Sequence, residues 1–337
     1  MKKKICILYT GGTIGMVPTE KGYAPKQGYF RDAIAEIPDI HEPDMPDWDF
    51  VEFDPLLDSS NIALDQWNMI GHAIADHYDN YDGFVVLHGT DTMAYTASAL
   101  SFMLEGLNKP VILTGSQIPL CMIRSDAADN IITSIYLAGC GVVKEVCLYF
   151  DGNLIRGNRA SKISADGLKA FGSPNYPLLA NAGIDIKYNE AAMELPKQPK
   201  QFNLQEFKQT SIGVLKIFPG IQFSLFDSIM TEKLNGIVLE TFGAGNIPSY
   251  DDALLPLIGK AFENGTIVTV CSQCQSGTVK LGAYATSSEL TKAGAVSGYD
   301  MPTEAAVAKL YYLFSKGYNK ETIKIFMEQN LRGELSD

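Results

Sequence analysis

Short apolar runs that end in glycine, a hydroxyl residue or aspartate recur along this chain and limit the folds open to it. They lie at residues 5–9, 84–87, 111–113, 146–150, 213–218, 236–239 and 266–270. Several are followed by apolar residues at helical spacing, such as Met93, Ala97 and Leu100 after the second run. Buried strands that alternate with helices are typical of an α/β protein with a largely parallel sheet.

The length of 337 residues favours two domains, because a single hydrophobic core tends to stop growing near ~250 to 300 residues. The alternation of strands and helices fails where the sequence becomes polar around PKQPKQ. We therefore expect an N-terminal α/β domain over residues 1–187, a linker over 188–210 and a C-terminal α/β domain over 211–337. The predicted fold class is α/β with two three-layer domains, the larger with a mostly parallel sheet and the smaller flavodoxin-like.

The formal net charge of −12 argues against nucleic acid as a partner, because phosphate binding needs clustered Lys and Arg. The apolar run from Ile5 to Tyr9 is too short for a secretory signal, and Thr10 and Gly11 interrupt it at once. No run approaches the ~20 apolar residues of a transmembrane helix. We expect a cytoplasmic protein with no membrane partner.

Six cysteines are scattered through the chain, and we expect them to be reduced and mostly buried. Cys271 and Cys274 form a single C-x-x-C, but the second pair of a structural zinc site is missing and the four histidines show no ligand spacing. The sequence therefore predicts no metal site, and no cofactor is expected.

The first apolar run leads directly into Thr10, Gly11, Gly12 and Thr13. Glycines let the backbone approach a ligand closely, and hydroxyls at the carboxyl end of a strand face the crevice where open α/β sheets bind ligands. The spacing matches neither G-x-G-x-x-G nor a P-loop, which argues against a nucleotide site. Taken alone, the segment favours a structural turn.

Further polar segments follow the later runs. HGTDT at residues 88–92 repeats the order of strand, glycine and hydroxyl, and its side chains can either cap the next helix or face a shared site. Asp58 and Ser59 have the same two interpretations, the helix in their case being the one that contains Trp67. Lys162 is either a solvated charge or a base beside a Thr hydroxyl and an Asp carboxylate.

Together these segments resemble the bacterial-type L-asparaginase family, and their order and spacing resemble its cytoplasmic, type I branch. The resemblance rests on YTGGTIG at 9–15, LHGTDTMAYTA at 87–97, TGSQIP at 114–119 and RGNRASK at 156–162, and extends through TFGAGN at 241–246, SQCQSG at 272–277 and NLRGEL at 330–335. It implies an N-terminal catalytic domain that hydrolyses the side-chain amide of L-asparagine through a threonine nucleophile and a β-acyl-enzyme.

The resemblance also implies catalytic roles for individual residues. Thr13 matches the family's nucleophile, and Tyr23 matches the tyrosine that activates or orients it. Thr90, Asp91 and Lys162 match a second catalytic group that activates a nucleophile or a water molecule. The order in which Thr13 and Thr90 act stays open.

For substrate binding, the resemblance implies that Asp58 and Ser59 grip the α-amino and α-carboxylate groups, while Thr90 and Asp91 complete the site and Asp91 holds the α-ammonium. It further implies a homodimer or a homotetramer built as a dimer of dimers. In such an assembly Asn246 is expected to reach into a partner's site.

Some type I enzymes carry a second, regulatory asparagine site with an arginine just before the segment that corresponds to TFGAGN. Here that position is Glu240, and a carboxylate cannot replace a guanidinium that grips a carboxylate. We therefore predict that the regulatory site is absent or altered.

Three alternative functions remain open at this point. A glutaminase-asparaginase is the nearest, because one methylene is worth only ~1 to 3 kcal/mol of discrimination. An enzyme acting on amidated transfer RNA is disfavoured by the acidic charge. A non-catalytic amino-acid sensor is disfavoured because Thr13, Thr90, Asp91 and Lys162 are all present.

Overall fold

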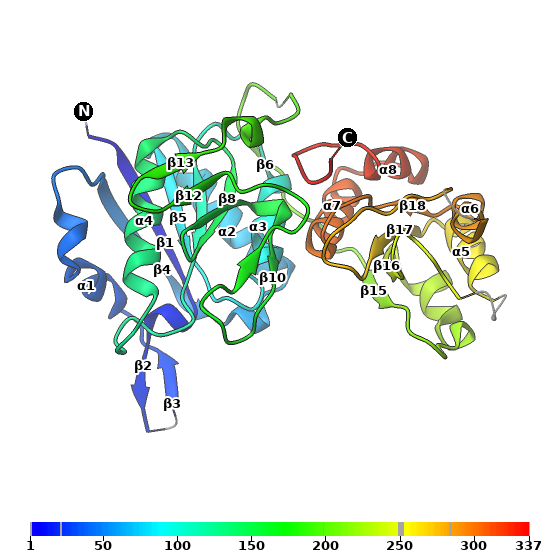
Figure 1. Cartoon of the computed structure of the whole chain (residues 1–337), viewed down its shortest axis with the longest axis horizontal. Coiled ribbons are helices and arrows are strands. Elements are labelled where there is room, and N and C mark those ends of the chain that lie inside the picture. The colour runs from blue at the N-terminus through cyan, green and yellow to red at the C-terminus, as the bar shows by residue number, and fades with distance from the viewer. Residues whose placement is uncertain (1, 21, 198, 249–252, 283–284, 337) are drawn as a thin grey trace. The chain divides into compact units, whose positions relative to one another are not determined.

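The structure is a computed structural model that describes residues 2–20, 22–197, 199–248, 253–282 and 285–336. Contacts divide the chain into two compact units, Met1–Leu204 and Gln205–Asp337, which are coloured blue to green and green to red in Figure 1. Within the described residues, no helix is both long enough and apolar enough to cross a lipid bilayer.

The first unit is built on an eight-stranded sheet in the order β13-β12-β9-β8-β7-β5-β1-β4. Neighbours from β4 to β8 are parallel, and β9, β12 and β13 extend the sheet with antiparallel pairs. The strands are β1 Lys4–Gly11, β4 Asp47–Leu57, β5 Gly83–Leu87, β7 Val111–Thr114, β8 Val146–Phe150, β9 Asn153–Arg156, β12 Ala180–Ala182 and β13 Ile186–Tyr188.

Helices cover both faces of this sheet (Figure 1). They are α1 Phe30–Ala35, α2 Leu64–His77, α3 Met93–Met103 and α4 Ala127–Cys140. Short strand pairs lie outside the main sheet: the hairpin β2 Met16–Thr19 with β3 Gly22–Pro25, β10 Ser161–Lys162 with β11 Phe171–Gly172, and β6 Leu104–Glu105 with β14 Asn203–Leu204. Because β14 pairs with β6, part of the segment 188–210 packs as strand in the first unit.

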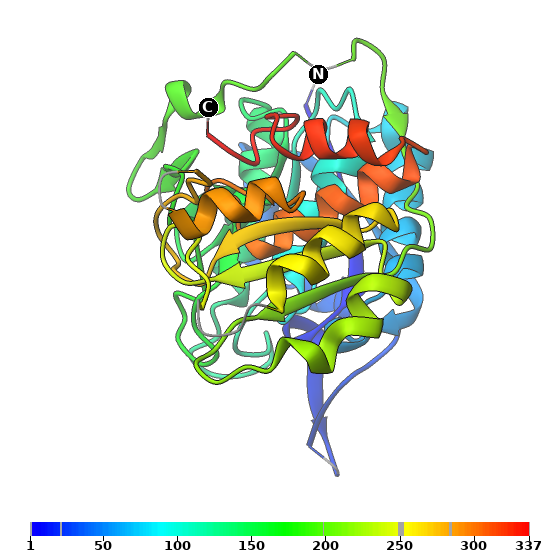
Figure 2. The same cartoon turned by 90° about the vertical axis from the view of Figure 1, so that its right-hand side faces the viewer.

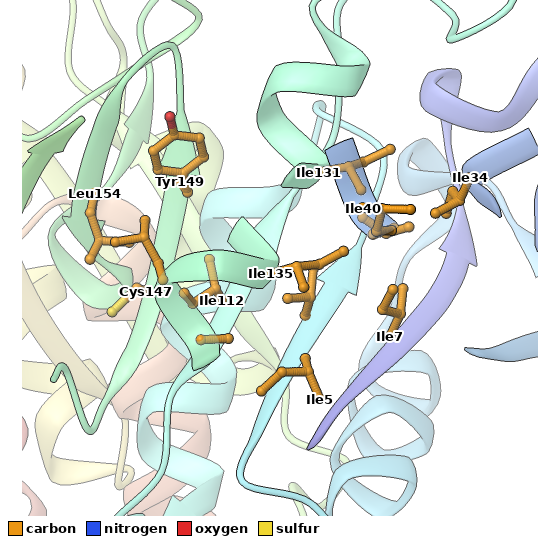
Figure 3. Close-up of a cluster of buried hydrophobic side chains, with 14 of the residues drawn as sticks. Ile5, Ile7, Ile34, Ile40, Ile112, Ile131, Ile135, Cys147, Tyr149 and Leu154 are labelled. Atoms are coloured by element: carbon orange, nitrogen blue, oxygen red, sulfur yellow. The ribbon is translucent and has the colours of Figure 1, made fainter. Parts of the chain in front are cut away.

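The core of the first unit follows from the alternation of side chains along β1. Ile5 and Ile7 lie with Ile34 of α1 and with Ile131 and Ile135 of α4 in one buried cluster (Figure 3). Each fully buried aliphatic side chain of this kind contributes about 1.5 to 3 kcal/mol of transfer free energy. The neighbouring strands β5, β7 and β8 are buried along their whole length, as central parallel strands are.

The second unit is a smaller three-layer domain. Its four parallel strands follow the order of the chain: β15 Ile212–Lys216, β16 Gly236–Thr241, β17 Ile267–Ser272 and β18 Val296–Ser297. Its helices are α5 Leu254–Glu263, α6 Ala285–Lys292, α7 Thr303–Ser315 and α8 Lys320–Met327. In Figure 2 the yellow helix α5 lies in front of the sheet. It packs in one cluster with alternate residues of β16 and β17.

The expected α/β class, with a larger and a smaller parallel-sheet unit, is confirmed. Every predicted apolar run contains or overlaps a strand. Asn319 caps α8 by accepting a hydrogen bond from the Thr322 N–H at 2.9 Å. The smaller sheet has a sequential order, whereas a flavodoxin order would place its second strand at the edge.

A buried ion pair joins α7 to the C-terminal segment of the second unit. Lys309 of α7 lies 2.6 Å from Glu334, and both side chains are 0% exposed. Lys309 also donates to the carbonyls of Met327 and Gln329, and Glu334 accepts the Leu331 N–H. Burial alone would raise the pKa of Glu334, but the Lys309 charge and the N–H donors outweigh it and lower the pKa.

Candidate functional site

The carboxyl ends of three adjacent strands lie level with one another. Tyr9 of β1 pairs with Leu87 of β5, and Leu87 pairs with Thr114 of β7. The loops that follow therefore leave the same edge of the sheet, which is where open α/β sheets bind ligands. Two hydroxyls at this edge form hydrogen bonds to the neighbouring strand: Thr10 donates to the Leu87 carbonyl, and Thr114 donates to the Tyr149 carbonyl. These two hydroxyls therefore connect strands and do not face a pocket.

Glycines allow the first two loops to touch. Gly12 has a φ of 91°, and a Cβ on it would lie 2.5 Å from the Cα of Gly89. A Cβ on Gly89 would in turn lie 2.4 Å from the hydroxyl of Ser59. No side chain fits at either position, so the backbone around Thr13 meets the backbone before Thr90, with buried Ser59 beside them.

Thr90, Asp91 and Lys162 form one hydrogen-bonded group. The Lys162 ammonium donates to the Thr90 hydroxyl at 3.0 Å and to the Asp91 carboxylate at 2.8 Å. The Lys162 side chain is 21% exposed and Asp91 is 63% exposed, so the group is open to solvent on one side. The Thr90 hydroxyl contacts the Lys162 ammonium, which also contacts the Asp91 carboxylate, so Thr90 and Lys162 are close enough to exchange a proton.

The polar side chains in the loops before α2 and α3 do not cap those two helices. The Thr92 hydroxyl donates to the Ser59 carbonyl at 2.7 Å and makes no cap for α3. Asp58 caps its own short turn by accepting the Ser60 N–H at 3.0 Å. Its interpretation as a cap for α2 is wrong, since Gln66 fills that place by accepting the Ala63 N–H.

His88 is a buried support for Thr90 that the sequence reasoning missed. Its Nδ1 faces the Gly89 carbonyl at 2.7 Å, which can only accept, so Nδ1 carries the proton. Its Nε2 then accepts from Thr96, whose oxygen accepts the Trp67 indole N–H. Burial lowers the pKa of His88 to about 4, so the ring stays neutral near pH 7 and is unsuited to proton transfer there.

Two other expected site residues, Tyr23 and Asn246, lie on elements outside the main sheet of the first unit. Tyr23 is 47% exposed on the β2–β3 hairpin, which extends away from the sheet in Figure 1. Asn246 belongs to the second unit, where its backbone pairs with Phe242.

The cysteine expectation needs a correction. Cys6, Cys147 and Cys271 are buried, but Cys121, Cys140 and Cys274 are exposed, because they lie in loops or at helix ends instead of in strands. None of the six is in a disulfide. In the part of the chain that the structure describes, no three His, Cys, Asp or Glu side chains are grouped as metal ligands.

Comparison with known proteins gives matches along nearly the whole chain. The family model described as Asparaginase, N-terminal matches residues 4–194, and the Glutaminase/Asparaginase C-terminal domain matches residues 211–327. The chain is 45% identical to L-asparaginase 1 of Escherichia coli (strain K12), with 99% of this chain and 98% of that one covered.

Solved structures agree with these matches. L-asparaginase I of Vibrio cholerae O1 biovar eltor str. N16961 has a TM-score of 0.93 at 44% identity, and the match covers 100% of both chains. The thermostable L-asparaginase from Thermococcus kodakarensis has a TM-score of 0.89 at 31% identity over 99% of each chain.

Proposed function

Because the chain belongs to the asparaginase family, we propose that it hydrolyses the side-chain amide of L-asparagine with Thr13 as its nucleophile. The observation that carries the proposal is the Lys162–Thr90–Asp91 group, which lies on the loop whose Gly89 backbone touches Gly12. A neutral hydroxyl is a poor nucleophile until a base takes its proton. The contact between the loops puts a proton-exchanging group close to the segment that carries Thr13.

In this mechanism the Thr13 oxygen attacks the side-chain amide carbon, ammonia leaves, and the aspartyl group stays as an ester on Thr13. Water then cleaves the ester and releases L-aspartate. Thr90 and Lys162 move the protons, and backbone N–H groups of the glycine turn stabilise the oxyanion, a donor of this kind being worth about 3 to 4 kcal/mol. Tyr23, which is exposed on the hairpin that follows the Thr13 turn, activates or orients Thr13.

Asp58, Ser59 and Asp91 hold the α-ammonium and α-carboxylate groups of the substrate. Support comes from the buried Ser59 hydroxyl next to Gly89 and from the Asp91 carboxylate, which is 63% exposed and has a second oxygen besides the one bound to Lys162. A carboxylate and a hydroxyl that match a zwitterion favour an amino acid over a simple amide.

Ammonia release from L-asparagine, L-glutamine and D-asparagine tests the function. We expect L-asparagine to be preferred over L-glutamine at least about 10-fold in kcat/KM, because one methylene changes the fit of a closed site. Equal rates for the two L-amides would indicate a glutaminase-asparaginase. Binding of asparagine without ammonia release would indicate a sensor and would contradict the proposal.

We also propose that the protein is a cytoplasmic homodimer or homotetramer in which Asn246 reaches a partner's site. Six unpaired cysteines support a reducing compartment. Large apolar side chains that are exposed in the second unit support association with another copy: Val214, Phe218, Leu225 and Ile229.

The regulatory site is proposed to be absent or altered. Glu240 accepts a hydrogen bond from the Thr303 hydroxyl at 2.7 Å, and its other oxygen lies 3.9 Å from Lys216. The position therefore holds a carboxylate that already accepts one hydrogen bond and lies near one ammonium group. We expect the initial velocity to rise hyperbolically with L-asparagine concentration, and a sigmoidal curve would contradict this expectation.

A further inference from the structure

We propose that Thr96 is a positioning residue that orients the His88 ring and, through that ring, the peptide group at Gly89. The inference rests on the proposed function and adds a residue of the protein interior to its machinery. Thr96 is fully buried in α3, so its side chain can affect the reaction only through the residues that it contacts.

Three side chains form one hydrogen-bonded chain, and the two ends of the chain set the position of every proton in it. At one end the Trp67 indole N–H can only donate, and it donates to the Thr96 oxygen at 3.1 Å. At the other end the Gly89 carbonyl can only accept, so the His88 Nδ1, 2.7 Å away, carries the ring proton. The His88 Nε2 is then an acceptor, and the Thr96 hydroxyl donates to it at 3.0 Å.

The His88 ring is therefore held at both of its nitrogens. Burial lowers the pKa of His88 to about 4, so the ring stays neutral near pH 7 and keeps one donor and one acceptor. Without the Thr96 hydroxyl, Nε2 would lose its donor at a buried position, which is unfavourable for a polar atom. A ring that turned to recover a donor would give up its hydrogen bond to Gly89.

The Gly89 peptide is the place where two loops of the site meet. A Cβ on Gly12 would lie 2.5 Å from both the nitrogen and the Cα of Gly89. Because the backbones are this close, a shift of the Gly89 peptide would move the Thr13 turn relative to Thr90. It would also change the contact between Thr90, the next residue in the chain, and Lys162.

The part of the site that is proposed to hold the substrate is anchored separately. The Thr92 hydroxyl donates to the Ser59 carbonyl at 2.7 Å, and this hydrogen bond does not involve His88. Loss of the Thr96 hydroxyl should therefore disturb the contact between the two catalytic loops more than the binding of substrate. The expected effect is on kcat and much less on KM.

The first test compares variants of one helix. Thr96→Val keeps the shape of the side chain but removes the hydroxyl, and we expect kcat to fall about 10- to 100-fold with KM changed less than about threefold. Ser98→Ala is the matched control, because the buried Ser98 hydroxyl of α3 has no hydrogen-bond partner among the described residues. Thr96→Ser retains a hydroxyl and should keep kcat within about threefold of the wild type. A Thr96→Val kcat within twofold of that of Ser98→Ala would overturn the proposal.

His88→Asn separates positioning from packing. The asparagine amide can replace the Nδ1–H that donates to Gly89, but it is too short to reach Thr96. If Thr96 acts through His88, adding Thr96→Val to His88→Asn should lower kcat by less than about twofold, compared with about 10-fold or more in the wild type. Equal losses in the two backgrounds would indicate a packing effect and would overturn the proposal.

The wild-type protein provides a test that does not depend on the folding of Thr96→Val. The ¹⁵N spectrum of histidine-labelled enzyme near pH 7 should show the His88 ring protonated on Nδ1 and unprotonated on Nε2. His88→Asn identifies these signals by removing them. A ring protonated on Nε2, or on both nitrogens, would overturn the proposal.

The two proposals fail in different ways. If the wild type and Ser98→Ala release ammonia and Thr96→Val matches them, only the positioning role is wrong. If the wild type itself releases no ammonia from L-asparagine, the proposed function is wrong and the positioning role falls with it. The ¹⁵N spectrum would still report whether the hydrogen-bonded chain is present.

Discussion

Replacing Thr13 by valine is expected to lower the rate of ammonia release from L-asparagine at least about 10³-fold, because the nucleophilic oxygen is lost. Valine has nearly the shape of threonine, so the half-buried turn Thr13–Gly15 should keep its backbone. The loop contact between Gly12 and Gly89 involves only backbone and should be unaffected. The measurement is steady-state ammonia release, with the melting temperature recorded to show that the variant is folded.

Two variants control this result. Thr13→Ser retains a hydroxyl and should keep a measurable part of the activity. Thr291→Val removes an exposed threonine of α6 and should leave the rate unchanged. Substantial turnover by Thr13→Val would remove Thr13 from the role of nucleophile and leave Thr90 as the candidate.

Replacing Lys309 by methionine is expected to destabilise the protein by about 3 to 5 kcal/mol, because the Glu334 carboxylate would stay buried without its charge partner. The carbonyls of Met327 and Gln329 would lose their donor as well. The measurement is the free energy of unfolding from a denaturant titration that follows the second unit.

The exposed ion pair of Lys260 with Asp227 is the matched control. Its side chains are 52% and 48% exposed, so Lys260→Met should cost less than about 1 kcal/mol. Adding Glu334→Gln to Lys309→Met should recover part of the loss, since a neutral amide can still accept the Leu331 N–H. Equal losses for Lys309→Met and Lys260→Met would contradict the assigned importance of the buried pair.

Most of the strands that the sequence predicted are fully buried. The run at 84–87 lies in the middle of the sheet, is covered on both faces, and is therefore apolar throughout. In contrast, β4 at the sheet edge has the sequence DWDFVEFDPLL and is only partly buried, so it offers no apolar run and was missed. The buried strands and the helices between them predicted the three-layer class, but only the structure gives the order of the strands in each sheet.

The residue types of the site were predictable from the sequence, but most of the contacts between them were not. The family resemblance indicated Thr90, Asp91 and Lys162, but Lys162 reaches Thr90 from 72 positions away in the chain, a proximity that no local spacing encodes. Gln117 belongs to the motif TGSQIP, but nothing in that motif indicates that its amide oxygen accepts a hydrogen bond from Thr90. The sequence analysis considered His88 only as a metal ligand. Its actual role, a hydrogen bond to the Gly89 carbonyl, leaves no pattern in the sequence.

The central claim is that the aspartyl group is carried by Thr13. The most direct measurement is mass spectrometry of tryptic peptides from enzyme quenched in acid during turnover of L-asparagine, for the wild type and for Lys162→Met, in which hydrolysis of the ester should be slowed. The proposed mechanism predicts an aspartyl adduct at Thr13 in the peptide of residues 5–21, absent from Thr13→Val. An adduct found instead on the peptide that contains Thr90 would contradict it.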